Sequence, residues 1–389
     1  DLHSFPTRRS SDLLVRDRVL NLPVNGSLSI SLGSHGSRTT IRAADADSIT
    51  LNGERAAGDS PLYRRTFAFI EHIRRGAPQP LAISSENTIP TAAGLASSAS
   101  GFAALTRALN AYWQLGLPDA VLSALARIGS GSAARSLWHG FVKWDKGEQA
   151  DGSDSIAAPI VSDWQDLRIA LLPIDSGAKK TTSGDGMNHT TATSPLYVAW
   201  PATAARDLAT IEAAIHAHDF STLAATAEAN ALAMHATMLA ARPALCYLHG
   251  ASLDALHRLW QQRADGLEIY ATIDAGPNIK ILYQQCDEAA VRAAYPQAVC
   301  INPLFLPVSA PQSPHQCRDL RIVVFHAMKE AVKNIGVLIF QQGGESLLFG
   351  RRRICIVILQ IALQHNIQFL DTATRQPGQS WVHNVSSST

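Results

Sequence analysis

The chain has 389 residues, a formal net charge of +1, an apolar fraction of 46% and a charged fraction of 17%. These values are typical of a globular protein long enough for two domains with substantial cores. The near-zero net charge argues against a nucleic-acid or membrane-surface partner. Apolar runs are too short to span a membrane, and the five scattered cysteines have no CxxC spacing, which predicts reduced thiols in a cytoplasmic protein.

Residues 1–14 show no hydrophobic periodicity that continues into the rest of the chain, and the chain does not begin with methionine. They carry basic residues and serines but no apolar core, so they do not read as a signal peptide. We interpret them as a non-native segment and expect the fold to begin at about residue 15.

The stretch from residue 15 to residue 90 predicts mainly strands. Ser27–Leu32 alternates serine with apolar residues, which is typical of a half-buried strand. Asn52-Gly53 is a hairpin signal that closes another strand. In chain order, the expected elements are strands at 27–32, 39–42 and 48–51, a helix at 63–75 and a strand at 81–84.

A run of small residues, Pro90–Leu105 (PTAAGLASSASGFAAL), opens a helix whose apolar residues Phe102, Leu105 and Leu109 keep helical spacing. Free backbone N–H groups and the helix dipole at such a start favour a bound phosphate. The alternative is a small-residue helix packed tightly against a neighbour. The stretch is not a P-loop, because the chain contains no GxxxxGK[ST] motif.

A second run of small residues, Gly129–Ser136, follows a predicted helix at 119–127 and precedes a strand at 140–144. Its single basic side chain, Arg135, is either a surface cation or a fork for a carboxylate or phosphate. The next turn holds Asp151 and Asp154, which indicate turn chemistry or, less directly, a magnesium site.

The pattern restarts near residue 165 with a strand at 167–173, so we place a domain boundary there. Lys179–Met187 is expected to be a polar loop that closes over a ligand. Alanine-rich helices are expected at 201–216, 220–239 and 248–263. His235 lies in the second of these helices, where a core or capping histidine is the expected role.

A strand at 270–273 ends at Asp274-Ala275-Gly276-Pro277-Asn278. Asp274 either starts a turn or supplies a catalytic carboxylate at a strand end. A strand at 279–283, a helix at 287–294 and a strand at 299–302 follow. The expected division is a non-native segment at 1–14, domains at 15–165 and 166–305, and an unassigned tail at 306–389.

These motifs, in this order, resemble the diphosphomevalonate decarboxylase family of the GHMP kinase superfamily. The match rests on PTAAGLASSA, GSGSAAR, Gly186-Met187, Met234-His235-Ala236 and DAGPN, and it covers residues 16–305. The resemblance implies an α/β (α+β) fold of two domains, the first ribosomal-protein-S5-like and the second ferredoxin-like. It also implies ATP, Mg²⁺, a small-molecule substrate (mevalonate 5-diphosphate) and a homodimer.

The resemblance also implies roles for individual residues. Asp274 matches the essential aspartate, which orients or deprotonates the 3-hydroxyl group, and Arg135 matches the arginine that binds the C1 carboxylate. No residue is assigned to a metal. The residues matched to the substrate site are Ser130, Gly131, Ser132, Ala133, Ala134, Arg65 and Ser183, and those matched to the ATP phosphate loop are Ala93, Gly94, Leu95, Ala96, Ser97 and Ser98.

The chain departs from the family at two places. Family members carry a Tyr-Trp-Gly-Lys run just before Arg16-Asp17, where this chain has Leu13-Leu14-Val15, and the closing segment is not recognisable after Leu304. We therefore expect this polypeptide to be inactive or weakly active around an intact core. Alternatives are a phosphomevalonate decarboxylase or mevalonate 3-kinase on the same scaffold, and a catalytically impaired nucleotide-binding relative.

Overall fold

The computed structural model describes residues 2–4, 15–17, 19–74, 79–88, 97–175, 181 and 183–304. The chain divides into two compact units, residues 1–307 and 308–389, and all described residues belong to the first. The predicted phosphate-loop residues Ala93, Gly94, Leu95 and Ala96 and the tail at 306–389 lie outside the described residues.

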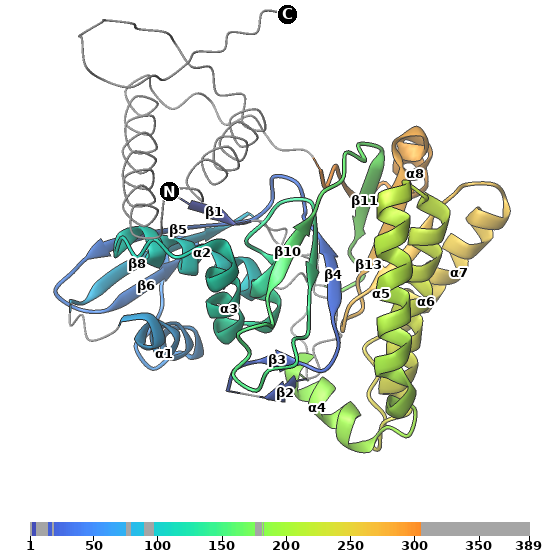
Figure 1. The fold of residues 1–389 in the computed structure, drawn as a ribbon. Coiled ribbons are helices and arrows are strands. Elements are labelled where there is room, and N and C mark those ends of the chain that lie inside the picture. The colour runs from blue at the N-terminus through green and yellow to red at the C-terminus, as the bar shows by residue number, and fades with distance from the viewer. Residues whose placement is uncertain are drawn as a thin grey trace, which may run out of the picture. The chain divides into compact units, whose positions relative to one another are not determined.

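A five-stranded sheet opens the fold, with strand order β1-β5-β8-β6-β7 and only β6 and β8 parallel (Figure 1). The predicted strands in this region are confirmed. Leu2–Ser4, which the sequence excluded from the fold, pairs antiparallel with β5 as an edge strand. The strands are β1 (Leu2–Ser4), β5 (Ser37–Ala43), β8 (Leu81–Asn87), β6 (Ser48–Leu51) and β7 (Glu54–Arg55).

Three helices pack with this sheet: α1 (Pro61–Arg74), α2 (Ser97–Tyr112) and α3 (Asp119–Gly129). The helical spacing predicted from Phe102, Leu105 and Leu109 is confirmed, because all three are at most 7% exposed in one core. That core also takes Ile70 of α1 and Ile83 of β8. Burial of this apolar face is the main force that holds the helices against the sheet.

Gly129, the last residue of α3, packs directly against α2. A Cβ at this position would lie 2.3 Å from Cδ1 of Phe102, which is closer than side chains approach. We expect Gly129→Ala to lower the free energy of unfolding by about 1–3 kcal/mol through overpacking, measured by urea denaturation. Gly250→Ala is the control, because a Cβ there meets nothing within 4 Å. Equal stability of the Gly129→Ala and wild-type proteins would contradict the close packing.

The next sheet has the order β10-β9-β4, built from β10 (Ala157–Ile160), β9 (Phe141–Trp144) and β4 (Ser27–Ile30). The strand predicted at 27–32 is confirmed over Ser27–Ile30, but it is not half-buried, because both faces are covered. Ile30 packs in a core with Phe141. On the other face, Ser27 and Ser29 are at most 2% exposed. A short pair, β2 (Val15–Asp17) with β3 (Leu22–Pro23), precedes β4.

The second half of the fold is a four-stranded antiparallel sheet with order β12-β13-β11-β14. Its strands are β11 (Leu167–Leu172), β12 (Tyr270–Ile273), β13 (Ile279–Gln284) and β14 (Val299–Ile301). The helices are α4 (Ser183–Thr193), α5 (Trp200–Ala217), α6 (Phe220–Leu239), α7 (Gly250–Ala264) and α8 (Glu288–Ala294), with short 3₁₀ turns η3 (Tyr197–Ala199) and η4 (Gln285–Asp287). Figure 1 shows α5 and α6 running side by side along this sheet.

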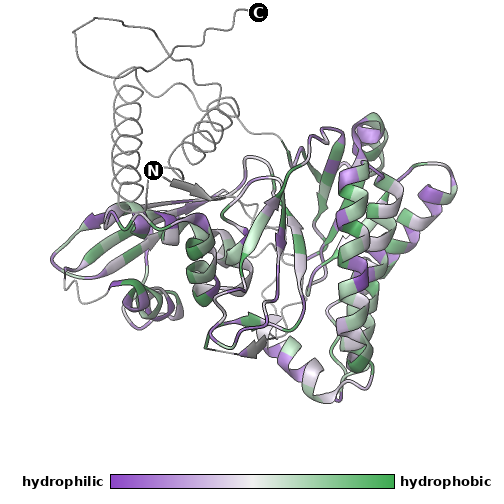
Figure 2. Cartoon of the chain, viewed as in Figure 1, coloured by the Kyte–Doolittle hydropathy of each residue, from purple (hydrophilic) through white to green (hydrophobic). Residues whose placement is uncertain are grey.

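Strand β11 is buried on both faces because its alternate side chains enter two cores. Leu167 and Ile169 join the core with Ile215 of α5 and with β4. Leu172 joins the core with Leu259 of α7 and with α8. Figure 2 shows β11 as mostly hydrophobic. Apart from Arg168, its residues 167–172 are apolar, which reflects the burial of the strand on both faces.

The prediction that Lys179–Met187 is a loop is wrong for its second half, where α4 begins at Ser183. The helix has few apolar residues, so no periodicity signals it. Its stability comes from its packing and its own hydroxyl groups. A Cβ on Gly186 would lie 2.3 Å from the Tyr247 hydroxyl, and Thr190 donates to the Gly186 carbonyl at 2.8 Å. Residues 176–180 and 182 lie outside the described residues.

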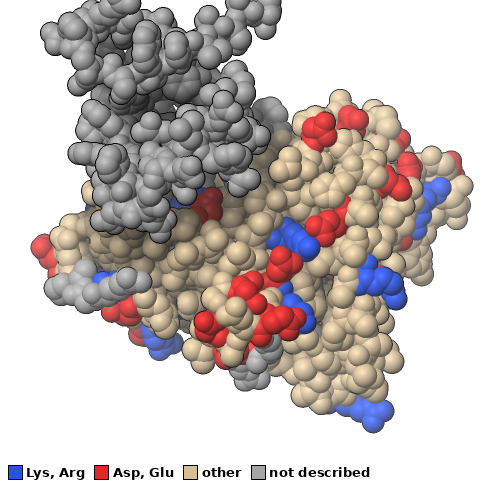
Figure 3. Space-filling view, viewed as in Figure 1, with Lys and Arg blue, Asp and Glu red and all other residues tan. Residues whose placement is uncertain are grey.

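Charged side chains of both signs are interspersed on the face shown in Figure 3. Some of them form ion pairs, such as Lys143 with Glu212 at 3.1 Å. Among the described residues, no helix has the length and apolarity needed to cross a membrane.

Candidate active site

The turn Asp274–Asn278 is held rigidly between β12 and β13. The Asn278 side-chain oxygen accepts the backbone N–H groups of Ile174 at 2.7 Å and Asp175 at 2.9 Å, just after β11. Ser252 of α7 donates to the Pro277 carbonyl at 2.8 Å. These bonds fix the turn from two sides, so the direction of the Asp274 side chain is set by the fold.

The Asp274 carboxylate forms an ion pair with Lys280 of β13, with 2.5 Å between Oδ2 and Nζ. The Lys280 side chain is 6% exposed and that of Asp274 is 17% exposed. Lys280 was not among the site residues predicted from the sequence. The available signal was a single lysine in the apolar run 279–283, because a buried lysine requires a partner.

His235 of α6 touches the same turn. Its Nε2–H donates to the Asp274 carbonyl oxygen at 3.1 Å, and the residue is 3% exposed. The prediction of a core histidine is confirmed. Burial lowers the pKa of His235 to about 4, an effect partly opposed by Asp274 and reinforced by Lys280. The imidazole is therefore neutral at pH 7.

This pKa makes stability depend on pH. Between pH 6.5 and about 4 the unfolded chain binds a proton at His235 that the folded chain does not, so stability falls as pH falls through this window. We expect His235 to account for a loss of about 3 kcal/mol at most. His235→Gln is expected to flatten the dependence in chemical denaturation at pH 4–7, and the exposed His216→Gln is the control. If His235→Gln and wild type lost the same stability between pH 7 and pH 4, His235 would not be the source of the pH dependence.

Arg135 is fully buried at the end of a short 3₁₀ turn, η2 (Gly131–Arg135). Its Nη1 donates to the Ser27 hydroxyl of β4, and its guanidinium lies 5.7 Å from the centre of the Trp144 ring. The surface-cation alternative is therefore wrong. A stacked, buried guanidinium is a rigid fork for a planar anion.

The residues before Arg135 are also buried. Ser130 is 3% exposed and Ser132 is 1% exposed, while Ala133 and Ala134 are fully buried. The Ser123 hydroxyl of α3 donates to the Ala134 carbonyl at 3.1 Å and accepts the Ala157 N–H of β10 at 2.9 Å. Small side chains are needed here because η2 packs between α2, α3 and β9.

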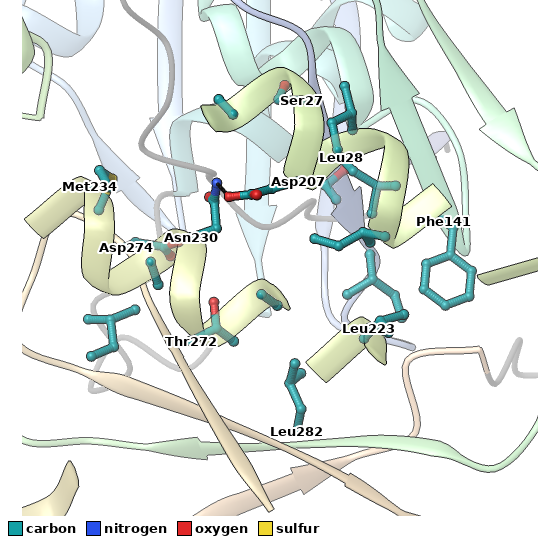
Figure 4. Close-up of a pocket in the computed structure, with 18 of the residues that line it drawn as sticks. Ser27, Leu28, Phe141, Asp207, Leu223, Asn230, Met234, Thr272, Asp274 and Leu282 are labelled. Carbon is teal, nitrogen blue, oxygen red and sulfur yellow. Dashed lines mark hydrogen bonds between the residues drawn. The ribbon is translucent and has the colours of Figure 1, made fainter. Parts of the chain in front are cut away.

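A cavity of about 100 Å³, which we call the Asp274 cavity, is lined by one of the predicted site residues, Asp274. It lies between β4, the helices α5 and α6, and the β12–β13 hairpin. Figure 4 shows its lining, with Asp207 and Asn230 pointing toward each other and hydrogen-bonded at 2.9 Å. Ser27 lines the cavity and accepts from Arg135, whereas Arg135 itself is fully buried and lines neither cavity described here. Its polar lining residues are Ser27, Ser29, Asp207, Asn230, Thr272 and Asp274.

A second cavity of about 240 Å³, the α2 cavity, lies beside the first turns of α2 and against α1 and β8. Ser98 and Arg65 line this cavity and not the Asp274 cavity. Arg65 donates to the Gly129 carbonyl at 2.9 Å and lies 5.1 Å from the Phe102 ring centre, and burial lowers its pKa. The hydrogen bond to the Gly129 carbonyl places Arg65 next to the buried segment Ser130–Arg135.

Other predicted positions are only partly placed. Ser97 begins α2, but its side chain is not described, and Ser183 begins α4 outside both cavity linings. The turn-chemistry interpretation of Asp151 and Asp154 is confirmed. Asp154 accepts the Glu148 N–H at 2.7 Å, and Asp151 accepts the Ser153 N–H at 3.0 Å.

The helix-covered sheets, the buried Gly/Ser turn with its arginine and the strand-end aspartate together define a two-domain GHMP kinase fold. Family models match both halves of the chain. The model of the diphosphomevalonate decarboxylase-like N-terminal domain covers residues 15–157, and that of the mevalonate 5-diphosphate decarboxylase C-terminal domain covers residues 169–335. The chain therefore belongs to the diphosphomevalonate decarboxylase family. The second match continues past residue 305, where the recognised motifs end.

Characterised relatives agree with this assignment. The chain is 39% identical over 301 residues to diphosphomevalonate decarboxylase of Aspergillus fumigatus, covering 71% of this chain and 74% of the relative. It is 37% identical to the Homo sapiens enzyme, covering 68% and 72%.

Solved structures agree as well. Mevalonate diphosphate decarboxylase from Staphylococcus aureus matches with a TM-score of 0.72 and 34% identity, covering 77% of this chain and 94% of that one. A structure of MDDEF in complex with MVAPP, AMPPCP and magnesium matches with a TM-score of 0.71, 34% identity and the same coverage.

Proposed function

We propose that the chain catalyses the ATP-dependent decarboxylation of mevalonate 5-diphosphate to isopentenyl diphosphate, ADP, phosphate and CO₂. One observation carries the proposal: Asp274 lines a cavity that also contains Ser27, the partner of the buried Arg135. A carboxylate in the cavity, with a buried guanidinium bonded to a serine of the cavity lining, suits a substrate with a hydroxyl group and a carboxylate on neighbouring carbons.

The reaction requires a hydroxyl group to be turned into a leaving group. The 3-hydroxyl oxygen forms a bond to the γ-phosphorus of ATP, the bond from that phosphorus to ADP breaks, and the hydroxyl proton is released. Phosphate then leaves C3 with the bonding electron pair. The electrons of the C1–C2 bond form the C2=C3 double bond, and C1 departs as CO₂.

Asp274 and Arg135 act at the two ends of this change. The Asp274 carboxylate orients the 3-hydroxyl, whose proton is lost to solvent as the phosphoryl group is transferred, and remains ionised to stabilise positive charge that develops at C3. Arg135 holds the C1 carboxylate until the C1–C2 bond breaks. Ser130, Ser132 and the backbone of Gly131–Ala134 line the substrate, and Arg65 and Ser183 make further substrate contacts.

The ATP end of the site lies at the start of α2. Residues Ala93–Ser98 hold the phosphates. Among the described residues, no group of three or more His, Cys, Asp or Glu side chains is arranged to hold a metal ion. In nucleotide sites Mg²⁺ is held mainly through phosphates and water. Bound there, Mg²⁺ would neutralise charge on the phosphates.

The test is an assay with ATP and mevalonate 5-diphosphate labelled at C1. We expect labelled CO₂ and isopentenyl diphosphate in equal amounts, at a rate below that of the family because the Tyr-Trp-Gly-Lys run is absent. Phosphorylated substrate without CO₂ would indicate a 3-kinase instead. Turnover only with the 5-monophosphate would indicate a phosphomevalonate decarboxylase, and ATP binding without any turnover would indicate a nucleotide-binding relative.

We further propose that the protein is a cytoplasmic homodimer with domains at 15–165 and 166–305. The family resemblance supports the dimer, and the described cysteines Cys246, Cys286 and Cys300 are free thiols. The family models, which match 15–157 and 169–335, support the boundary. Sedimentation equilibrium would test the dimer, since a single species of 41.7 kDa would contradict it.

A further inference from the structure

Lys280 occupies a position where a charged side chain is unfavourable. It lies in β13 between Ile279 and Ile281, which are at most 1% exposed, and is itself 5% exposed. Removing an ammonium group from water costs several kcal/mol unless a partner restores the lost interactions. The position therefore needs a specific explanation, and the reaction outlined above does not yet use this residue.

The hairpin register directs Lys280 toward the site. Lys280 is the cross-strand partner of Thr272 in β12, so the two side chains lie on the same face. Thr272, Leu282 and Asp274 line the Asp274 cavity. Side chains two residues apart share a face of a strand, which places Lys280 on the side of the hairpin that faces the cavity.

Lys280 is also the cation that faces the Asp274 carboxylate. Two further groups among the described residues lie near Asp274: His235 from α6, which is neutral because burial lowers its pKa to about 4, and Asp207 from α5, which is hydrogen-bonded to Asn230 on the same cavity. His235 donates to the Asp274 carbonyl oxygen, so it fixes the backbone, whereas Lys280 contacts carboxylate Oδ2 at 2.5 Å. The His235 contact therefore holds the backbone of Asp274, and the Lys280 contact holds its carboxylate.

We propose that Lys280 is a positioning residue for the reaction, holding the Asp274 carboxylate ionised and turned into the cavity. The inference rests on the proposed function, in which Asp274 orients the hydroxyl group and stabilises positive charge at C3. Both tasks need the negative charge. An opposite charge within about 4 Å lowers the pKa of a carboxyl group by roughly 1–3 units, so loss of the ammonium raises it.

The test compares pH profiles of kcat/KM for wild type, Lys280→Met and Lys280→Arg. We expect Lys280→Met to move the acid limb upward by about 1–2 pH units and to lower kcat more than it raises KM. Lys280→Arg, which keeps the charge, is expected to restore the position of the limb. Lys143→Met is the matched control, because Lys143 pairs with Glu212 and not with Asp274. An unshifted acid limb in a folded Lys280→Met protein would overturn the proposal.

A second measurement does not depend on activity. With ¹³C-labelled aspartate, the Asp274 carboxyl signal is identified by its loss in Asp274→Asn and titrated by NMR. In wild type we expect a midpoint below the usual range of aspartate, and in Lys280→Met a higher one. If Lys280→Met does not fold, the wild-type midpoint decides, since a normal or raised value would refute the pairing role. A wild-type protein without decarboxylase activity would defeat the proposed function while leaving this titration informative.

Discussion

Replacing Asp274 with alanine is expected to lower kcat by about 10³-fold or more, because one group then ceases to orient the hydroxyl and to stabilise the developing cation. The side chain is held for this task by the Lys280 ion pair and by the fixed turn beneath it. Single-turnover CO₂ release from labelled substrate measures the loss directly. A decrease smaller than tenfold would remove Asp274 from the mechanism.

The stability of the variant must be separated from its activity. Asp274→Ala leaves the Lys280 ammonium buried without its carboxylate, which costs on the order of 3–5 kcal/mol. The double variant Asp274→Ala/Lys280→Met removes both charges. We expect it to regain most of the lost stability in urea denaturation and to stay as inactive as Asp274→Ala. Recovery of activity in the double variant would show that misfolding, and not loss of the carboxylate, caused the defect.

The sequence predicted most of the elements that bury a regular apolar face. The helix at 97–112 and the strand at 167–172 were evident because burial of one stripe or of two faces leaves a period in the chain. Helix α4 left no such period, since its few contacts come from distant residues such as Tyr247. Likewise, the second covered face of Ser27–Ile30 depends on neighbours that the strand itself does not encode.

The site was predictable in its residue types but not in its pairings. Asp274 at a strand end and Arg135 beside a Gly/Ser run were recognisable as chemical groups without knowledge of their surroundings. Their partners were not, because the Lys280 ion pair depends on hairpin register and the Ser27 contact joins segments far apart in the chain. Local sequence reports what a residue can do, whereas long-range packing decides which neighbour it meets.

Arg135→Lys is expected to lower kcat/KM by about 10²–10³-fold, mainly through weaker substrate binding. Lysine keeps the charge but loses the planar fork, and charge-assisted hydrogen bonds are worth roughly 1.5–3 kcal/mol each. The buried stack on Trp144 leaves the guanidinium little freedom to adapt. Calorimetry with mevalonate 5-diphosphate in the absence of ATP measures the binding loss without turnover.

A substrate analogue whose C1 carboxylate is replaced by a hydroxymethyl group identifies what Arg135 recognises. Wild type should bind the analogue far more weakly than the acid, and Arg135→Lys, which keeps the charge but not the planar fork, should show a smaller difference between the two. Arg107→Lys is the control, because Arg107 donates to the Leu137 carbonyl at 2.7 Å and pairs with Asp119, and it has no predicted role in the site. If Arg135→Lys weakened binding of the analogue and of the acid by the same factor, the role of Arg135 would be to support the fold around Ser27 and not to bind the carboxylate. The ratio of the affinity lost for the acid to the affinity lost for the analogue therefore distinguishes binding of the carboxylate from support of the fold. Loss of activity alone does not make this distinction.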